Sequence, residues 1–207
     1  MRYTNIMIDL ETLGTKPGSV ILSLGAVAFN LPSDRLYIED TSIDDLPTFY
    51  RAFSLVDTAR YPFTGDLDTI QWWMGQSHEA RQLFKERAIS VEQCLRGFMD
   101  FISETSNGSF VKIWGNGADF DNALLTAYYR ELHIQLPWRY HNNRCYRTAK
   151  DLPNIKQLTR RGVHHNALDD ALYQTECFLA AVTPSQAKNS ESPSNEQTDQ
   201  SPHLETT

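Results

Sequence analysis

Apolar positions along the chain fall into short runs separated by glycine, proline and charged residues, a pattern that predicts alternating strands and helices. Residues 5–10 and 20–29 are two such runs. The segment between them contains glycine, proline and lysine, so the pair predicts a β-hairpin. Residues 50–54 predict a third strand and residues 110–114 a buried one. A hairpin followed by alternating strands and helices favours an α/β sandwich around a mixed sheet.

Helical spacing of apolar residues predicts the remaining elements. Residues 66–74 and 78–87 are expected to be helical. Ser90 is the expected N-cap of the next helix, and Gln93 three positions later completes a capping box. Apolar residues at helical spacing continue that helix to position 102. Residues 121–132 and 167–182 predict two more helices, the second of which is the last element.

The composition changes abruptly at residue 184. Residues 184–207 contain three prolines, four acidic residues, one lysine and no aromatic residue. Such a segment cannot bury enough apolar surface to offset its ordering entropy. We therefore expect one folded domain, residues 1–183, and a disordered, acidic, polar tail, residues 184–207. A flexible end without a role and a partner-binding segment both fit the tail.

Composition and charge restrict the class of protein. The chain has 207 residues, of which 41% are hydrophobic and 22% charged, as in ordinary globular proteins. Three cysteines without a CxxC pair argue against a disulfide scaffold and a thiolate zinc site, and fit a reducing cytoplasm. The sequence contains no apolar run of about 18 residues, so we expect no membrane span. The net charge of −7 argues against holding nucleic acid by bulk positive charge, but permits contact through metal ions.

Two carboxylates end the first predicted strand. Asp9 and Glu11 are two residues apart, so their side chains point to the same face of the strand. Their like charges repel in a partly buried site, and a cation between them removes that repulsion. Hard oxygen ligands suit magnesium or manganese. A solvated strand end is the alternative for this pair alone.

Two further acidic groups follow predicted elements. Asp119 and Asp121 come after a buried strand, and either a metal site or a dipole-stabilised helix start fits them. His165 and Asp170 are five residues apart, a rotation of about 140° on one helix. If His165 precedes the helix and Asp170 lies in its first turns, both side chains reach one cleft and Asp169 points elsewhere. Surface residues at a helix start are the alternative.

Together, these residues resemble the motifs of the DEDDh 3′–5′ exonucleases, a superfamily with a ribonuclease-H-like fold. Asp9-Leu-Glu11-Thr12 is similar to the first motif of the superfamily, Phe120-Asp121 to the second and His165 with Asp170 to the third. The resemblance covers residues 5 to about 180. Residues 69–73, Thr-Ile-Gln-Trp-Trp, further resemble the branch of phage exonucleases and mycobacterial exoribonuclease-like proteins. One departure is Asn116-Gly117, where many relatives have His-Asn.

The resemblance implies a single-domain α/β fold, a ribonuclease-H-like mixed β-sheet flanked by helices. It also implies a metal-dependent enzyme that hydrolyses single-stranded DNA or RNA, or 3′ overhangs, from the 3′ end and releases nucleoside 5′-monophosphates. Two divalent cations, Mg²⁺ or Mn²⁺, would act in it. By the resemblance, Asp9 bridges both ions, Glu11 and Asp170 complete the first site, and Asp121 supports the second. His165 takes the proton from the attacking water, and its ordinary pKa suits that role.

Candidate substrate contacts come from three places. By the resemblance, Thr12 and Leu13 meet the terminal nucleotide, although Leu13 also fits a core position. Asn116 lies in the second motif. Residues 139–161 form a basic stretch interleaved with aromatic residues, a combination that binds single strands, although a solvated loop also fits. The candidate contacts from this stretch are Arg144, Arg147, Lys156 and Arg160.

Other functions stay open from the sequence. An exoribonuclease restricted to short oligoribonucleotides would carry the same motifs. A non-catalytic module that binds nucleic acid or a protein partner could share the fold, although it would not need all five catalytic residues. The resemblance permits a monomer or a homodimer. We expect a cytoplasmic protein of a bacterium or a phage-infected cell.

Overall fold

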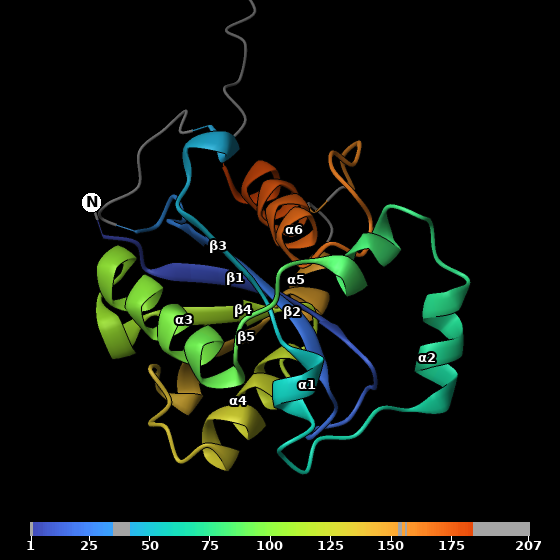
Figure 1. Ribbon diagram of the computed structural model, residues 1–207. Coiled ribbons are helices and arrows are strands. Elements are labelled where there is room, and N and C mark those ends of the chain that lie inside the picture. Colours follow the sequence, from blue (N-terminus) through green and yellow to red (C-terminus); the bar gives the residue numbers. More distant parts are fainter. Residues whose placement is uncertain (1, 35–41, 153–154, 156, 184–207) are drawn as a thin grey trace, which may run out of the picture.

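A computed structural model describes residues 2–34, 42–152, 155 and 157–183. Its centre is a five-stranded sheet in the order β3-β2-β1-β4-β5 (Figure 1). β1 is antiparallel to β2 and parallel to β4, so the sheet is mixed, as expected. The strands are β1 (Asn5–Thr12), β2 (Ile21–Phe29), β3 (Thr48–Ala52), β4 (Lys112–Gly115) and β5 (Asn143–Cys145). The predicted tail, 184–207, lies outside the described residues.

The first two strands form the predicted hairpin. All residues of β1 and β2 are buried. Their near-continuous apolar runs fit this burial. A strand that is covered by helices on both faces does not need polar residues at alternate positions. The register places Asp9 opposite Gly25.

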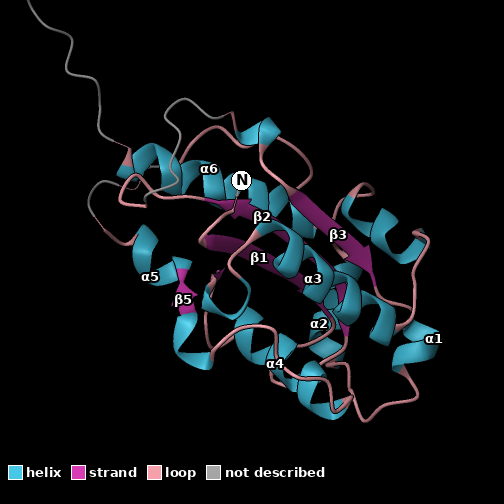
Figure 2. Cartoon of the chain, turned by 90° about the vertical axis from the view of Figure 1, so that its left-hand side faces the viewer, coloured by secondary structure: helices cyan, strands magenta, loops and turns pink. Residues whose placement is uncertain are grey.

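Helices cover both faces of the sheet (Figure 2). α3 (Val91–Thr105) and α4 (Asp121–Glu131) pack on one face, and α5 (Tyr146–Lys150) and α6 (Ala167–Val182) pack on the other. The capping box of Ser90 and Gln93 is confirmed. Two short helices, α1 (Leu55–Thr58) and α2 (Leu67–Met74), follow β3. The expected α/β sandwich around a mixed sheet is therefore confirmed.

Three predicted boundaries differ from the structure. Residues 78–87 do not form an α-helix but contain the 3₁₀ turns Ala80–Lys85, whose N-terminal Glu79 gives no side-chain cap. β3 begins two residues before the predicted start at Tyr50 and ends at Ala52. Phe110 is not in a strand but ends a 3₁₀ turn (Gly108–Phe110) and is 62% exposed. Two further 3₁₀ turns are Ile43–Asp45 and Tyr140–Asn142.

The two faces of β1 have different roles. Ile6, Ile8 and Leu10 belong to the core under α3 and α4, whereas Met7 packs in the core under α6. Because strand side chains alternate, Asp9 and Glu11 share the face of Met7 and point toward α6. In the described part of the chain, no helix is long and apolar enough to span a bilayer.

Candidate active site

Three carboxylates converge between β1 and α6. Ligand oxygens of Asp9, Glu11 and Asp170 all lie within 4.8 Å of one another, and all three residues are buried. Asp9 and Glu11 come from the same face of β1, and Asp170 comes from the first turn of α6. The structure thus brings together residues that are about 160 positions apart in the sequence.

Asp121 is a fourth buried carboxylate beside this cluster. It is the first residue of α4, after a short turn (residues 116–120) that follows β4, and its Oδ1 accepts a hydrogen bond of 3.2 Å from the backbone N–H of Leu10. Its Oδ2 is buried and has no hydrogen-bond partner among the described residues. A buried carboxylate oxygen without a partner is costly unless another group, such as a cation, satisfies it.

Burial raises the pKa values of Asp9, Glu11 and Asp121, and repulsion from neighbouring acids adds to this at Asp9 and Glu11. Burial, and then the charges of Asp121, Glu11 and Asp170, hold the pKa of Asp9 well above its usual range. Burial and the neighbouring Asp170 and Asp121 raise the pKa of Glu11 to about 8. Burial raises the pKa of Asp121 to about 7. The ionised cluster is therefore unfavourable without a counter-charge.

These residues fit a divalent cation. Hard carboxylate oxygens are preferred by Mg²⁺ and Mn²⁺. The cluster supplies three such groups within reach of one ion. Asp121 is close enough for its charge to act on Asp9 and Glu11, and it keeps one buried oxygen without a partner among the described residues. A bound cation would also remove the repulsion that raises the pKa values.

Without metal, the protein is expected to lose stability between pH 5 and pH 8. Folded Glu11 and Asp121 keep their protons up to about pH 8 and about pH 7, whereas the unfolded chain releases them near about pH 4. Over this range the folded state binds more protons, so its stability falls as the pH rises. Thermal unfolding in EDTA should give a Tm lower by about 5 °C at pH 8 than at pH 5. Mg²⁺ should restore it, and a Tm in EDTA that does not fall would contradict the buried cluster.

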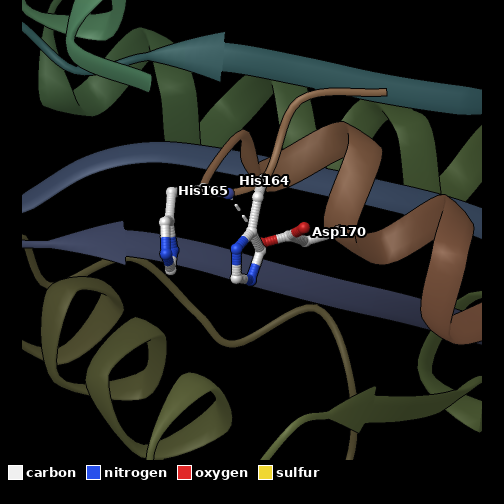
Figure 3. A group of neighbouring side chains, drawn as sticks. All are labelled: His164, His165 and Asp170. Atoms are coloured by element: carbon white, nitrogen blue, oxygen red, sulfur yellow. Dashed lines mark hydrogen bonds between the residues drawn. The ribbon is translucent and has the colours of Figure 1, made fainter. Parts of the chain in front are cut away.

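His165 lies at the edge of the cluster, in the loop before α6. Its backbone is left-handed, with φ 66°, and its N–H donates a 3.3 Å hydrogen bond to Asp170 Oδ2. Figure 3 shows its ring beside that of His164, and the ring centres are 3.9 Å apart. Burial and His164 lower the pKa of His165, which favours a neutral imidazole at neutral pH. Asp169 turns away as expected, because its Oδ2 accepts from the N–H of Val163.

Gln174 is a site residue that the sequence reasoning missed. It lies one helical turn after Asp170 on α6, and its Nε2 donates a 2.7 Å hydrogen bond to Asp9 Oδ1. Its Oε1 is buried without a hydrogen-bond partner among the described residues. The four-residue spacing from Asp170 was the available signal, since such residues share a helix face.

The cluster opens into a cleft of about 920 Å³. Of the seven proposed substrate contacts, Thr12, Asn116 and Arg160 line it. Leu13 packs instead against the small core around Leu22 and Trp73. Four of the five catalytic candidates also line it, namely Asp9, Glu11, His165 and Asp170, whereas Asp121 does not. The other lining residues are Leu10, Thr15, Asp68, Thr69, Trp72, Trp73, Phe120, Tyr146, Lys150, Asp151, Ile155, Gln157, His164, Tyr173 and Gln174.

The basic stretch does not form one continuous surface along the cleft. Arg144 donates to the backbone carbonyls of His141 and Asn143 and is not a lining residue of the cleft. Arg147 is exposed and is not a lining residue of the cleft, and its charge opposes the effect of burial, which raises the pKa of Asp121. Lys156 lies outside the described residues. Trp138 is buried in the core against Phe98 and Tyr129, so it offers no exposed ring for stacking.

The two adjacent tryptophans have different places. Trp73 is buried, and its Nε1 donates a 2.9 Å hydrogen bond to the carbonyl of Thr12. Trp72 is 45% exposed, lines the cleft and lies edge-on to His165, with ring centres 4.8 Å apart. Trp73 therefore fixes the strand end, and Trp72 presents an aromatic surface next to the candidate base.

Comparison with known families agrees with this geometry. The family described as "3'-5' exoribonuclease Rv2179c-like domain" matches residues 4–182. A search among curated proteins gave no match.

Solved structures show the same fold at low sequence identity. The nuclease domain of 3'hExo, a DEDDh family member bound to rAMP, is 13% identical with a TM-score of 0.50, over 86% of this chain and 91% of that chain. A zinc-bound complex of E. coli ExoI with ssDNA is 13% identical with a TM-score of 0.55, over 87% of this chain and 40% of that chain. CRN-4, a cell-death related nuclease, is 14% identical with a TM-score of 0.48 over 86% of this chain. The chain spans 64% of CRN-4 and 40% of ExoI. The likenesses to 3'hExo and to ExoI confirm the ribonuclease-H-like fold.

Proposed function

The chain belongs to the Rv2179c-like 3′–5′ exoribonuclease domain family, and from this membership and the geometry of the cleft we propose its substrate and mechanism. It removes nucleotides from the 3′ end of single-stranded RNA, or of a single-stranded 3′ overhang, and releases nucleoside 5′-monophosphates. The observation that carries the proposal is the convergence of the Asp9, Glu11 and Asp170 carboxylates within 4.8 Å at the base of an open cleft.

The acidic residues hold the divalent cations that the reaction requires. Asp9, Glu11 and Asp170 are the proposed ligands of one cation, and Asp9 with Asp121 faces a second. When bound, Mg²⁺ or Mn²⁺ supplies an activated water and stabilises the charge that develops on the phosphate. Gln174 donates to one oxygen of Asp9 and leaves the other for a cation, so it orients the central carboxylate.

His165 is the proposed general base. Its lowered pKa keeps the ring neutral at neutral pH, so a ring nitrogen can accept the proton of the attacking water. The hydrogen bond from its backbone N–H to Asp170 and the ring contact with Trp72 fix its position. His164 and Trp72 also shield one side of the imidazole.

The strand end after Glu11 supports recognition of the 3′ nucleotide. Thr12 lines the cleft, and its side-chain hydroxyl donates a 2.7 Å hydrogen bond to the carbonyl of Gly14. The same oxygen can still accept a hydrogen bond, which a substrate hydroxyl could donate. Trp72 offers an exposed ring for stacking a base, a contact that tolerates any sequence.

Product analysis tests this proposal. A single-stranded RNA carries one ³²P in its last phosphodiester linkage, and the label is followed after incubation with Mg²⁺. Cleavage of the 3′-oxygen bond to phosphorus should release the label as a nucleoside 5′-monophosphate in the first turnover. Label in a 3′-phosphorylated product or in a longer fragment would contradict the proposal. A parallel series of lengths separates a general exoribonuclease from one limited to short oligoribonucleotides.

His165→Ala should slow cleavage by about 10²- to 10⁴-fold, because that is the usual contribution of a positioned general base. Mn²⁺ affinity should stay within about twofold, because the ring is not one of the proposed ligands. Single-turnover kinetics and calorimetry give the two values. His164→Ala is the matched control, and its rate should fall much less. Unchanged turnover in His165→Ala would remove His165 from the proton-transfer step.

A further inference from the structure

Arg160 places a positive charge directly on the acidic cluster. Its Nη1 forms an ion pair with Asp170 Oδ1. Its charge also lowers the pKa of Glu11, against the effect of burial. The side chain is 29% exposed and lines the cleft, so it can move without unpacking the core.

The same carboxylate belongs to the proposed metal ligands. Asp170 contributes a carboxylate to the cluster with Asp9 and Glu11. A guanidinium on that carboxylate reduces the repulsion between buried acids, as a cation does. The two positive groups therefore compete for Asp170.

We propose that Arg160 is an exchangeable counter-cation: it pairs with Asp170 in the metal-free enzyme and leaves that carboxylate when a divalent cation binds. The inference rests on the proposed metal-dependent function. It makes Arg160 a positioning residue that keeps the empty cluster in shape and sets the affinity for metal.

The wall of the cleft gives the released side chain a place to stay. The guanidinium carbon of Arg160 lies 4.4 Å from the centre of the Tyr173 ring, a cation–π contact. The Tyr173 hydroxyl donates to the carbonyl of Leu158, which fixes the ring. Arg160 and Tyr173 both line the cleft, so the positive charge of Arg160 stays available to the phosphates of a bound strand.

The adjacent arginine is a natural control. Arg161 pairs with Glu176 at 2.9 Å and with Asp44 at 3.5 Å, outside the acidic cluster. Arg160 and Arg161 are consecutive residues of one loop, and replacing either of them by glutamine changes the net charge by the same amount. A difference between the two variants therefore reports the contact with Asp170.

Calorimetric titration with Mn²⁺ tests the competition. Arg160→Gln should lower the Kd about five- to tenfold, because a charge-assisted contact no longer has to break. Arg160→Lys should stay close to the wild type, because it retains the charge, and Arg161→Gln should have the wild-type Kd. Equal Kd values for Arg160→Gln and wild type would overturn the inference. Absence of Mn²⁺ binding to the wild type would overturn the proposed function as well.

Thermal unfolding separates an exchangeable contact from a permanent one. In EDTA, Arg160→Gln should unfold at a lower temperature than the wild type, since the cluster loses its counter-cation. In saturating Mn²⁺ the two proteins should unfold at the same temperature, because the contact is absent from both. An equal loss of Tm in both conditions would show that Arg160 stays on Asp170, and would overturn the inference.

Discussion

Asp9→Asn is expected to abolish tight Mn²⁺ binding and to lower the rate of RNA hydrolysis by about a thousandfold, an effect of about 4 kcal/mol. Asp9 has the central place in the cluster, because its carboxylate lies with those of Glu11 and Asp170 and the charge of Asp121 also acts on it. The amide keeps the size of the side chain but removes the charge that a cation needs. Calorimetry and single-turnover kinetics measure the two losses.

The same variant should not destabilise the metal-free protein. Burial and three neighbouring acids raise the pKa of Asp9 well above its usual range, which shows that its charge is unfavourable there. A neutral amide at this position therefore relieves repulsion. In EDTA at pH 8, Tm should equal or exceed the wild-type value. Asp119→Asn is the control, because Asp119 is exposed and is not part of the cluster. Wild-type metal affinity in Asp9→Asn, or its loss in Asp119→Asn, would contradict the assignment.

Gly25→Ala is expected to destabilise the protein by about 3 kcal/mol, the upper part of the range for overpacking, and to lower Tm by about 6–12 °C. Gly25 lies opposite Asp9 in the hairpin, where the start of α6 crosses β2. A Cβ there would lie 2.2 Å from the carbonyl carbon of Ala167 and 2.3 Å from the N of Leu168. These are backbone atoms, so α6 itself must shift.

That shift should also weaken metal binding, because Asp170 lies in the first turn of α6. Thermal unfolding and Mn²⁺ titration of the same preparation give both effects. Gly97→Ala is the matched control: its Cβ would meet the Phe49 ring at an ordinary 3.5 Å, inside helix α3. It should keep or raise Tm, because alanine favours a helix over glycine. Wild-type Tm and metal affinity in Gly25→Ala would show that the close approach of α6 does not hold the site.

The part of the site that the sequence could predict depends on short-range geometry. Strand alternation predicted that Asp9 and Glu11 share a face, and the structure directs that face toward α6. The five-residue spacing required His165 to precede the helix that carries Asp170, and Asn166 is indeed the N-cap of α6. Both inferences needed only the side-chain periodicity within a single strand or a single helix.

The parts that could not be predicted depend on packing between distant elements. Gln174 contacts Asp9 across 165 positions, and only the docking of α6 on β1 brings them together. Trp138 directly precedes the basic stretch but packs into the core beside Phe98 and Tyr129, which local composition does not reveal. Leu13 follows the motif residue Thr12, yet its side chain packs with Leu22 in a small core that includes residues of the 3₁₀ turns Ala80–Lys85.

The most direct test of the account follows the shortening of a 5′-labelled single-stranded RNA by wild-type protein in Mg²⁺, in Mn²⁺ and in EDTA. Matched DNA of the same sequence, and the Asp9→Asn variant, are run beside it. The account predicts a ladder that descends one nucleotide at a time on RNA in either metal, none in EDTA, and one about a thousandfold slower with Asp9→Asn. A ladder that persists in EDTA, a wild-type rate with Asp9→Asn, or no cleavage of RNA by the folded wild-type protein would contradict it.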